Sequence, residues 1–389
     1  MATRYFSTTG AGTQDGTSWD NRTPIFSGAG WGPVLTGFNF SGDGMLALVG
    51  PGTYAITAAM STATFSIAPI ASGNLIIHGC DSAGNPLSPP DPNWTADMPV
   101  WDDSNLPVFH TTTNIITFSA VPHTSFRLIK CTATANNSSV ISYGVFNCLV
   151  DWCSITNGFN STTAKGLIGV TSSSVITNSI VRMTGAQYDY GIGASQFDIV
   201  NCQIIGNISA TGGDRRGIEC TATTESFTAV NCLIKNHGGA GIGTSLSQAA
   251  EKFAVISCTI TNNSGDGIQT GLQAGKTGRH IFLGNTITNN GGYGINSQAS
   301  SNILAFDNRL RDNVSGNFAG FLNFPTGIGN YATDSDDSSE YVDANAGDHR
   351  IKYGSTIWGS GYGVSEECPS AAASTVNIID PLSRSIPGV

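Results

Sequence analysis

The chain has 389 residues, of which 11% are charged and 40% hydrophobic, with 48 glycines and a formal net charge of −10. This much apolar material with so little charge excludes an intrinsically disordered chain. The acidic balance, 27 acidic against 17 basic residues without a basic run, argues against nucleic acid as a partner. The sequence has no apolar stretch of about 18 residues that could span a membrane.

The first 110 residues show only a weak repeat. They contain four of the six tryptophans and a proline-rich stretch from Pro86 to Pro99. The opening residues, Ala2 to Phe6, form neither the basic region nor the apolar region of a secretory signal. We therefore expect synthesis in a cytosol, or else a signal that has been removed.

A regular pattern fills residues 111–325 and is clearest in the segments 199–207, 229–236, 255–262 and 282–289. In each, a central small or polar residue is flanked two places on either side by aliphatic residues, and this period of two predicts a strand. The central position recurs at steps of 22 to 30 residues. It is occupied by Cys131, Cys153, Ser179, Cys202, Cys232, Cys258, Asn285 and Asn308.

A second marker is a glycine followed by an aliphatic or aromatic residue, which recurs at steps of 24 to 27 residues. It is found at Gly166, Gly191, Gly217, Gly241, Gly267, Gly294 and Gly320. Two markers with a matching period predict a solenoid whose coils each read strand, turn, strand, loop, strand. Because no helical periodicity is present, we predict an all-β fold, a right-handed parallel β-helix with capped ends, rather than a leucine-rich repeat.

The recurring central position is expected to form an internal ladder. Buried thiols pack as small hydrophobic groups, and stacked amides hydrogen-bond along the axis. Stacked residues lie in a line instead of converging, so we predict no metal site and no cofactor. The predicted structural ladder consists of Cys131, Cys153, Cys202, Cys232, Cys258, Asn285 and Asn308. The cysteines, nine in number, follow the repeat, which favours buried free thiols and a reducing compartment.

The flanks of the repeat are expected to protect the open strand edges of a solenoid. We divide the chain into an N-terminal cap with the first irregular coils (1–110), a regular parallel β-helix (111–325), and a C-terminal cap and tail (326–389). The last region begins with an acidic run, Asp334 to Glu340, which holds calcium or forms a solvated loop.

Two segments resemble the start and end signatures of right-handed parallel β-helix repeat proteins, namely Tyr5 to Trp19 and Val342 to Ile351. This group includes pectate-lyase-like enzymes, bacterial surface proteins and phage tailspikes. The resemblance covers most of the chain and implies the fold, not a function.

By resemblance to the polysaccharide-active members of that group, an enzyme of this fold would have its acid and base groups on the outward face of one sheet. The polygalacturonase-like signature is not met, because only its last piece has a match, in Arg350 to Lys352. The acidic residues of the body are interpreted as scattered, which weakens both a hydrolase, needing two carboxylates, and a calcium-dependent lyase. They include Asp189, Asp214, Glu219, Glu225, Glu251 and Asp266.

The residues just before the recurring glycines give the candidate binding site. They are expected to stack as an exposed row on one flank, formed by Tyr190, Arg216, Ala240, Asp266 and Tyr293. Within it Tyr190, Arg216, Asp266 and Tyr293 could grip a glycan or a partner protein; the alternative is an ordinary polar turn face. His237 is either a general base or a turn residue.

The leading hypothesis is a structural virion protein of a bacteriophage: a tailspike, fibre or capsid decoration. It would be made in the host cytoplasm and form a homo-oligomer, expected to be a trimer. Its partners would be other virion proteins, with a host polysaccharide as a further candidate. One alternative is a polysaccharide lyase or glycoside hydrolase, although no complete catalytic constellation is predicted. The other is a bacterial surface or adhesion protein, located outside the cell.

Overall fold

The computed structural model describes seventeen stretches of the chain. They are residues 2–24, 44–56, 75–89, 103–111, 116–118, 124–134, 139–143, 148–169, 174–194, 197–212, 214–220, 226–244, 252–270, 279–297, 302–319, 341–343 and 348–351. The acidic run from Asp334 to Glu340, Gly320 and Cys368 lie outside them.

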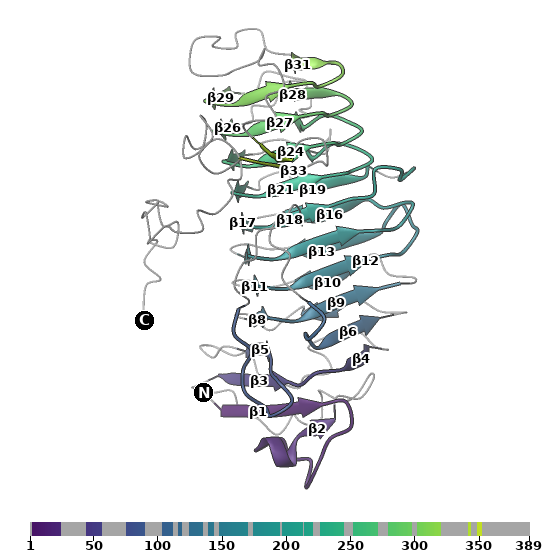
Figure 1. Cartoon of the computed structure of the whole chain (residues 1–389), viewed down its shortest axis with the longest axis vertical. Helices are drawn as coiled ribbons and strands as arrows, with labels where there is room; N and C mark the ends of the chain where they lie inside the picture. The colour runs from purple at the N-terminus through teal and green to yellow at the C-terminus, as the bar shows by residue number, and fades with distance from the viewer. Residues whose placement is uncertain are drawn as a thin grey trace.

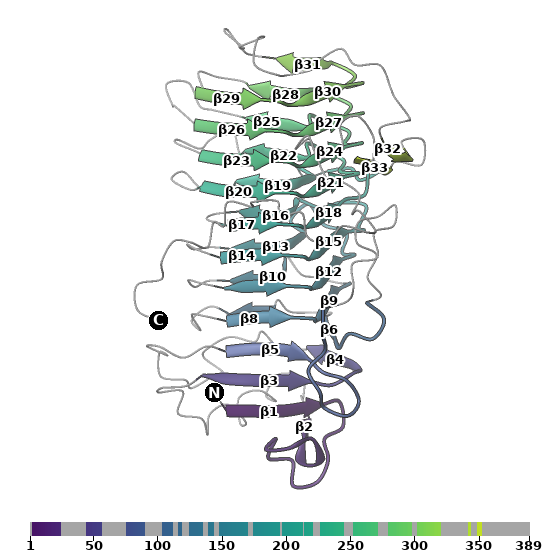
Figure 2. The ribbon, with the colours of Figure 1, turned by 60° about the vertical axis from the view of Figure 1, so that its left-hand side comes forward.

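The chain folds into a right-handed parallel β-helix, an elongated column in which each regular coil adds one strand to each of three parallel sheets (Figures 1 and 2). Sheet A contains β2 (Thr23–Pro24), β1 (Ala2–Ser7), β3 (Met45–Val49), β5 (Leu75–Gly79), β8 (Thr124–Arg127), β11 (Leu149–Asp151), β14 (Ser174–Thr177), β17 (Phe197–Val200), β20 (Ser226–Val230), β23 (Lys252–Ile256), β26 (Arg279–Leu283) and β29 (Asn302–Phe306).

Sheet B contains β4 (Thr53–Ile56), β6 (Val108–Thr111), β9 (Lys130–Ala133), β12 (Ser154–Asn157), β15 (Ile180–Met183), β18 (Gln203–Ile205), β21 (Leu233–Lys235), β24 (Thr259–Thr261), β27 (Thr286–Thr288) and β30 (Arg309–Arg311). Sheet C contains β7 (Ile116–Phe118), β10 (Ser139–Tyr143), β13 (Lys165–Gly169), β16 (Tyr190–Ala194), β19 (Arg216–Cys220), β22 (Ile242–Thr244), β25 (Ile268–Thr270), β28 (Tyr293–Ser297) and β31 (Gly316–Ala319).

Two further elements lie outside the three sheets. A short 3-10 helix, η1 (Trp19–Asn21), follows the first strand, and an antiparallel hairpin is formed by β32 (Tyr341–Asp343) and β33 (Asp348–Ile351), with β33 in contact with β24. The described part of the chain contains no α-helix, and none of its helical segments is long and apolar enough to cross a membrane.

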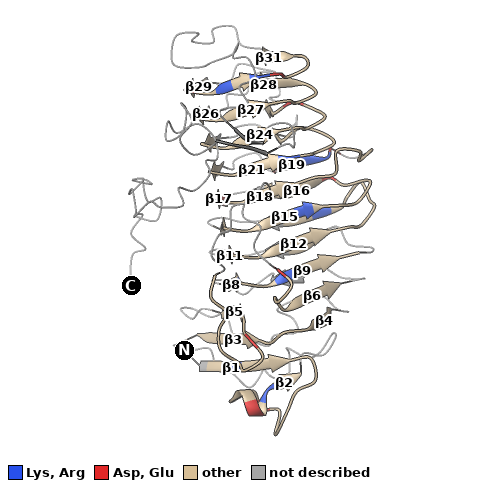
Figure 3. Ribbon diagram, viewed as in Figure 1, with Lys and Arg blue, Asp and Glu red and all other residues tan. Residues whose placement is uncertain are grey.

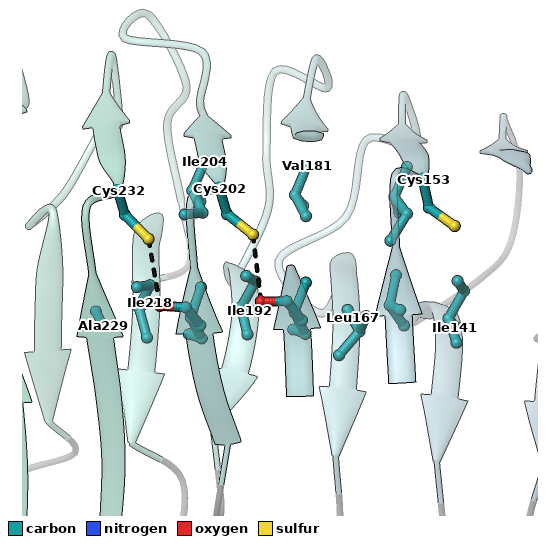
Figure 4. Packing of buried hydrophobic residues seen from close by; sticks show 14 of the residues in the cluster. Ile141, Cys153, Leu167, Val181, Ile192, Cys202, Ile204, Ile218, Ala229 and Cys232 are labelled. Atoms are coloured by element: carbon teal, nitrogen blue, oxygen red, sulfur yellow. Dashed lines mark hydrogen bonds between the residues drawn. The ribbon is translucent and has the colours of Figure 1, made fainter. Parts of the chain in front are cut away.

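Rows of aliphatic side chains fill the interior because every second residue of each strand points inward. The inner row of sheet C shows the regularity, since its members from β10 to β28 are all fully buried: Ile141, Leu167, Ile192, Ile218, Ile242, Ile268 and Ile295. Figure 4 shows Leu167, Ile192 and Ile218 of this row with Cys202 and Cys232 of the facing wall. The apolar residues that alternate in the sequence thus form the core.

The corner between sheets A and B explains the cysteine and asparagine ladder. One residue there has a positive φ, such as Asn201 at 53°, and the next residue points inward. The thiols of Cys202 and Cys232 donate to backbone carbonyls, those of Ile176 (3.5 Å) and Ile199 (3.4 Å) (Figure 4). The predicted positions from Cys153 to Asn308 are all buried, as expected for a structural ladder.

Asparagines take over this ladder in the later coils. The Nδ2 group of Asn285 donates to Oδ1 of Asn308 (2.8 Å) and to the carbonyl of Val255 (2.8 Å). The backbone N–H of Cys258 donates to Oδ1 of Asn285 (2.9 Å). The buried amides therefore have partners, as the free energy of burying a polar group requires.

Cys131 does not belong to this ladder, which corrects the sequence prediction. It pairs with Ile155 in the inner row of sheet B, and the corner position of its coil is Ile129, which follows the positive-φ residue Leu128. The step from Cys131 to Cys153 is short for that reason. A cysteine fits either inner row, so residue type alone did not separate the two.

A second ladder, at the corner that follows sheet B, was not predicted. Oδ1 of Asn290 accepts from the backbone N–H (3.2 Å) and Nδ2 (2.9 Å) of Asn263, and Oδ1 of Asn313 accepts the same two bonds from Asn290 (3.1 and 2.9 Å). The signal was present in the sequence, because Asn-Asn recurs at 262–263 and 289–290 and reads Asp312-Asn313 in the next coil.

The recurring glycines begin the strands of sheet C, where the backbone passes close to the next coil. A Cβ on Gly217 would lie 2.5 Å from the carbonyl oxygen of Gly241 and 2.7 Å from Cγ2 of Ile234. In the last coil Asn317 takes this position, since Ile295 pairs with Phe318. Glycine is therefore required at these positions, because the space between neighbouring coils does not admit a Cβ.

The expected boundary near residue 110 leaves no break in the sheets. In sheet A β5 pairs with β8, and in sheet B β6 pairs with β9. The N-terminal region thus contributes coils of the same β-helix. The division into three regions and the caps at both ends stay predictions.

All eight described cysteines are free and buried, which confirms the prediction for Cys202, Cys232 and Cys258. Burial raises the pKa of the Cys153 thiol to about 12. These thiols are packing groups of the core and are poor nucleophiles.

Candidate functional site

The predicted binding row does stack along sheet C. Tyr190 pairs with Arg216, and the register of the following strands places Ala240, Asp266 and Tyr293 in the same row. The row is not exposed, however. The exposed fractions of Tyr190, Arg216 and Asp266 are 4%, 7% and 8%, and only Tyr293 is partly open.

Two glycines explain this burial, because they let the row's side chains lie flat on the sheet. A Cβ on Gly193 would lie 2.5 Å from the Tyr190 ring, and a Cβ on Gly243 would lie 2.5 Å from Cδ of Arg216. Glu219 is between these glycines in the register of sheet C. Its carboxyl group therefore has the Tyr190 ring on one side and the Arg216 side chain on the other.

Glu219 is the most perturbed acid of the described chain. Its Oε1 accepts a hydrogen bond from Nη1 of Arg216 at 3.0 Å, whereas its Oε2 is buried without a hydrogen-bond partner. Burial raises the pKa of Glu219 to about 7, against the opposing effect of Arg216. A carboxyl group with this pKa changes between its protonated and ionised forms near neutral pH.

Two more acids join Glu219, so the interpretation of the body's acidic residues as scattered is wrong for these three. One carboxylate oxygen from each of Asp189, Asp214 and Glu219 lies within 4.8 Å of the other two. Burial also raises the pKa of Asp189. We call Asp189, Asp214 and Glu219 the carboxylate cluster. Its sequence signal was the spacing of 25 residues from Asp189 to Asp214, one residue short of the local coil period of 26 from Tyr190 to Arg216.

Two basic side chains balance much of the charge of the carboxylate cluster. Nζ of Lys165 lies 3.4 Å from Asp189 and 4.7 Å from the centroid of the Tyr190 ring. Nη1 of Arg216 lies 3.4 Å from Asp214 as well as contacting Glu219. Burial lowers the pKa of Lys165, but Tyr190 and Asp189 outweigh it, so the net shift is upward.

The carboxylate cluster is also the one group of the described residues with ligand atoms close enough to hold a metal ion. Three carboxylates suit a hard divalent cation. Here, however, Lys165 and Arg216 already contact all three acids, and a metal would have to displace their ammonium and guanidinium groups. The absence of a metal stays a prediction.

Beyond Arg216 the outer face of sheet C becomes uncharged apart from one acid. Nη2 of Arg216 donates to Oε1 of Gln269 (3.5 Å), and Asp266 accepts from Nδ2 of Asn296 (2.9 Å) and from the backbone N–H of Tyr293 (2.6 Å). Amides and a partly open tyrosine are groups that bind sugar hydroxyls and sugar ring faces.

His237 belongs to the core and not to this face. Its Nδ1 accepts from the Tyr188 hydroxyl (2.9 Å), and its Nε2 lies 3.1 Å from the carbonyl of Ile204. Burial lowers the pKa of His237 to about 4. The side chain is fully buried, so it is a structural corner residue and not an accessible base.

Arg350 likewise lies apart from the acids, in β33 of the antiparallel hairpin. Charged residues are sparse over the described part of the ribbon, as Figure 3 shows. Against that background, five ionisable side chains lie together on β13, on β19 and on the residues just before β16 and β19. They mark the chemically distinctive site: Lys165, Asp189, Asp214, Arg216 and Glu219.

Fold and site together define a parallel β-helix protein with a charged outer face. Its structure is similar to the crystal structure of pectate lyase Pel9A, with a TM-score of 0.54 and 15% sequence identity over 95% of this chain and 94% of that one. At this identity the likeness shows the fold alone. No family model and no curated protein matches the sequence.

Proposed function

We propose that the chain is a polysaccharide lyase with its active site at the carboxylate cluster. One observation carries the proposal: Glu219, with a pKa near 7, lies between the Tyr190 ring and the Arg216 guanidinium on an outer sheet face. Perturbed acids in such surroundings are typical of catalytic sites. The likeness in fold to a pectate lyase adds support, although it does not identify a substrate.

The roles follow from β-elimination on a uronic acid residue. A base removes the proton from C5, the electron pair forms the C4–C5 double bond, the C4–O4 bond breaks, and O4 takes a proton from water. Glu219 in its ionised form serves as the base, since its pKa matches neutral pH. Arg216 covers Glu219 in the free chain, so the substrate has to draw Arg216 and Lys165 away from the carboxylate cluster. Both side chains then bind the uronate carboxylate, which makes the C5 proton more acidic.

Glycoside hydrolysis is the second candidate, favoured by the spacing of the acids. Retaining hydrolases use two carboxyl groups about 5 Å apart, one as acid and one as nucleophile. Glu219, protonated below pH 7, would be the acid, and the exposed Asp214 the nucleophile. The two reactions differ in product, because only elimination leaves an unsaturated sugar that absorbs ultraviolet light.

The test is a panel of acidic and neutral polysaccharides, with chain length and ultraviolet absorbance followed together. We expect a uronate polymer to be shortened with a rise in absorbance. Glu219→Gln should lower the rate by about 100-fold or more, whereas Asp307→Asn, an exposed acid at a sheet A corner, should leave it unchanged. Shortening without absorbance would replace elimination by hydrolysis, and an active Glu219→Gln would remove the assigned role of this residue.

The role in a phage virion, the trimer, the virion partners and the place of synthesis remain predictions from the sequence, as does the alternative of a bacterial surface protein. The buried, unlinked cysteines support one premise of the virion hypothesis, which is folding in a reducing compartment. A lyase carried on a virion would satisfy both hypotheses.

A further inference from the structure

The outer face of sheet C continues beyond the carboxylate cluster, over the coils of β22, β25 and β28, which stack in that order on β19 (Figure 2). Neighbouring coils are about 4.8 Å apart, so Gln269 lies about 10 Å and Asn296 about 14 Å along the column from Glu219. A short oligosaccharide that is bound at the carboxylate cluster can therefore reach both. The outward residues of these coils are Ala240, Gly243, Asp266, Gln269, Tyr293 and Asn296.

The charge of the face changes beyond Arg216. The carboxylate cluster has two cations beside it, Lys165 and Arg216. None of the six outward residues that follow is a cation, and the one charged side chain among them is Asp266, which is 8% exposed. A uronate at these residues would meet the carboxylate of Asp266 without a compensating positive charge, which disfavours its binding. This part of the face therefore favours an uncharged sugar.

The two parts of the face are continuous. Between Glu219 and Gln269 the outward positions are occupied by Ala240 and Gly243, which have no long side chain to block a bound polysaccharide. In the free chain Arg216 lies over Gly243, where a Cβ would be 2.5 Å from its Cδ. A substrate that draws Arg216 away leaves a flat floor of two small residues between the carboxylate cluster and Gln269.

Three side chains beyond this floor have groups that can bind a ligand. Oε1 of Gln269 accepts from Nη2 of Arg216 (3.5 Å), which leaves Nε2 of Gln269 as a donor. Nδ2 of Asn296 donates to Oδ2 of Asp266 (2.9 Å), which leaves Oδ1 of Asn296 as an acceptor. Gln269, Tyr293 and Asn296 are all partly exposed. The face thus presents a donor, an acceptor and an aromatic ring.

Asp266 holds this arrangement in place. Its Oδ1 accepts from the backbone N–H of Tyr293 (2.6 Å), and its Oδ2 fixes the amide of Asn296. Gly292 makes room for the carboxylate, because a Cβ there would collide with Oδ1 of Asp266. Groups that are fixed before binding lose less conformational entropy when a ligand arrives. Asp266 is therefore a positioning residue.

We propose that Gln269, Tyr293 and Asn296 bind an uncharged sugar, and that the substrate is a polysaccharide in which uronates and uncharged sugars are neighbours. We call these three residues the neutral subsite. Sugar hydroxyls both donate and accept hydrogen bonds, and so match Oδ1 of Asn296 and Nε2 of Gln269, while a sugar ring packs against Tyr293. The uronate part of this inference rests on the function proposed for the carboxylate cluster.

The first test compares two kinds of polymer as substrates of the full chain, by ultraviolet absorbance. One kind contains uronates alone, and in the other a uronate alternates with an uncharged sugar. We expect kcat/KM to be about 10-fold or more higher for the alternating polymers. Tyr293→Ala should raise KM for them about 10-fold at unchanged kcat, because the lost contact is the same in the ground state and the transition state.

Two further variants support this comparison. Asn296→Ala should raise KM in the same direction by a smaller factor, since it removes one hydrogen bond. Thr156→Ala, at a partly exposed residue on the outer face of sheet B, is the control and should leave KM unchanged. Circular dichroism of all three variants checks that the fold is kept.

The second test measures binding without turnover. The Glu219→Gln chain is applied to an array of printed glycans, some acidic and some uncharged. We expect it to bind glycans that contain an uncharged sugar, and the double variant Glu219→Gln with Tyr293→Ala to lose this binding. Binding to uronate-only glycans alone would overturn the neutral subsite.

The neutral subsite and the lyase activity can fail separately. Faster cleavage of the uronate-only polymers, or an unchanged KM in Tyr293→Ala, would remove the neutral subsite and leave the lyase. Binding to the array that depends on Tyr293, without cleavage of any polymer, would remove the lyase and leave the neutral subsite. A chain that neither cleaves a polymer nor binds a glycan would contradict both.

Discussion

The outer faces of sheets A and C share one backbone geometry and carry opposite chemistry. On sheet C, Glu219 is flanked by glycines and enclosed by Tyr190 and Arg216. On sheet A, later coils present aliphatic side chains such as Ile281 and Leu304 to solvent. The inner rows of both sheets are alike. The coil therefore fixes where side chains stand, and the outward residues alone decide what each face does.

The largest expected effect comes from the shared interior, on which both faces depend. Ile218→Ala removes a fully buried side chain from the inner row of sheet C. We expect the free energy of unfolding to fall by about 2–5 kcal/mol, from lost burial and the cavity left behind. Ile208→Ala, at a residue 41% exposed, is the control in urea unfolding. Equal effects at both sites would contradict the inward assignment of Ile218.

The second prediction concerns the ionisation of Glu219 on sheet C. The pKa of Glu219 is raised from 4.5 to about 7, so the folded state holds its proton more tightly than the unfolded state. The contribution of this group is full below pH 4.5 and is lost as pH rises to 7. Relative to wild type, Glu219→Gln should therefore gain up to about 3 kcal/mol in unfolding free energy over that range.

Unfolding of both proteins at a series of pH values checks this, with Asp307→Asn as the matched variant on the other face. A constant difference between Glu219→Gln and wild type from pH 4.5 to 7 would show that Glu219 is ionised in the fold throughout. The environment of the carboxyl group would then resemble water, contrary to its burial.

A smaller effect is expected from the glycine beneath Arg216. Gly243→Ala puts a Cβ 2.5 Å from Cδ of Arg216, so this side chain must move off the sheet. We expect a loss of about 1–2 kcal/mol in stability and a further rise in the pKa of Glu219, whose ion pair with Arg216 is weakened. A carboxyl titration by NMR measures the pKa. Gly158→Ala, where the nearest atom would be 3.2 Å away, is the control.

Sequence patterns predicted the main repeats, apart from the ladder of Asn263, Asn290 and Asn313, and missed what does not repeat. The alternation around Cys202, Cys232 and Cys258 gave strands, inward direction and coil period, because the core demands the same residue type in every coil. Cys131 was assigned to the wrong row because two inner rows accept the same small side chain.

The candidate site was missed for the opposite reason. Asp189, Asp214 and Glu219 occupy three different places in the coil and converge only through the stacking of β16 and β19 with the turn between them. The row containing Tyr190 and Arg216 was placed correctly, but its burial was not foreseen. It depends on two glycines: Gly193, three residues after Tyr190 in the same strand, and Gly243, in the strand next to that of Arg216.

The buried amide ladders give the column a direction. Each member donates toward the C-terminus: Asn263 to Asn290, and Asn290 to Asn313. During synthesis the newest coil therefore lacks its acceptor until the following coil is made. Shortening the chain from its C-terminal side would take both the backbone N–H and the Nδ2 of the last ladder asparagine from their side-chain acceptor. Removing coils from the N-terminal side would take only a backbone carbonyl from Nδ2, such as that of Ile260 from Asn290. The two ends are therefore not equivalent sites for truncation or fusion.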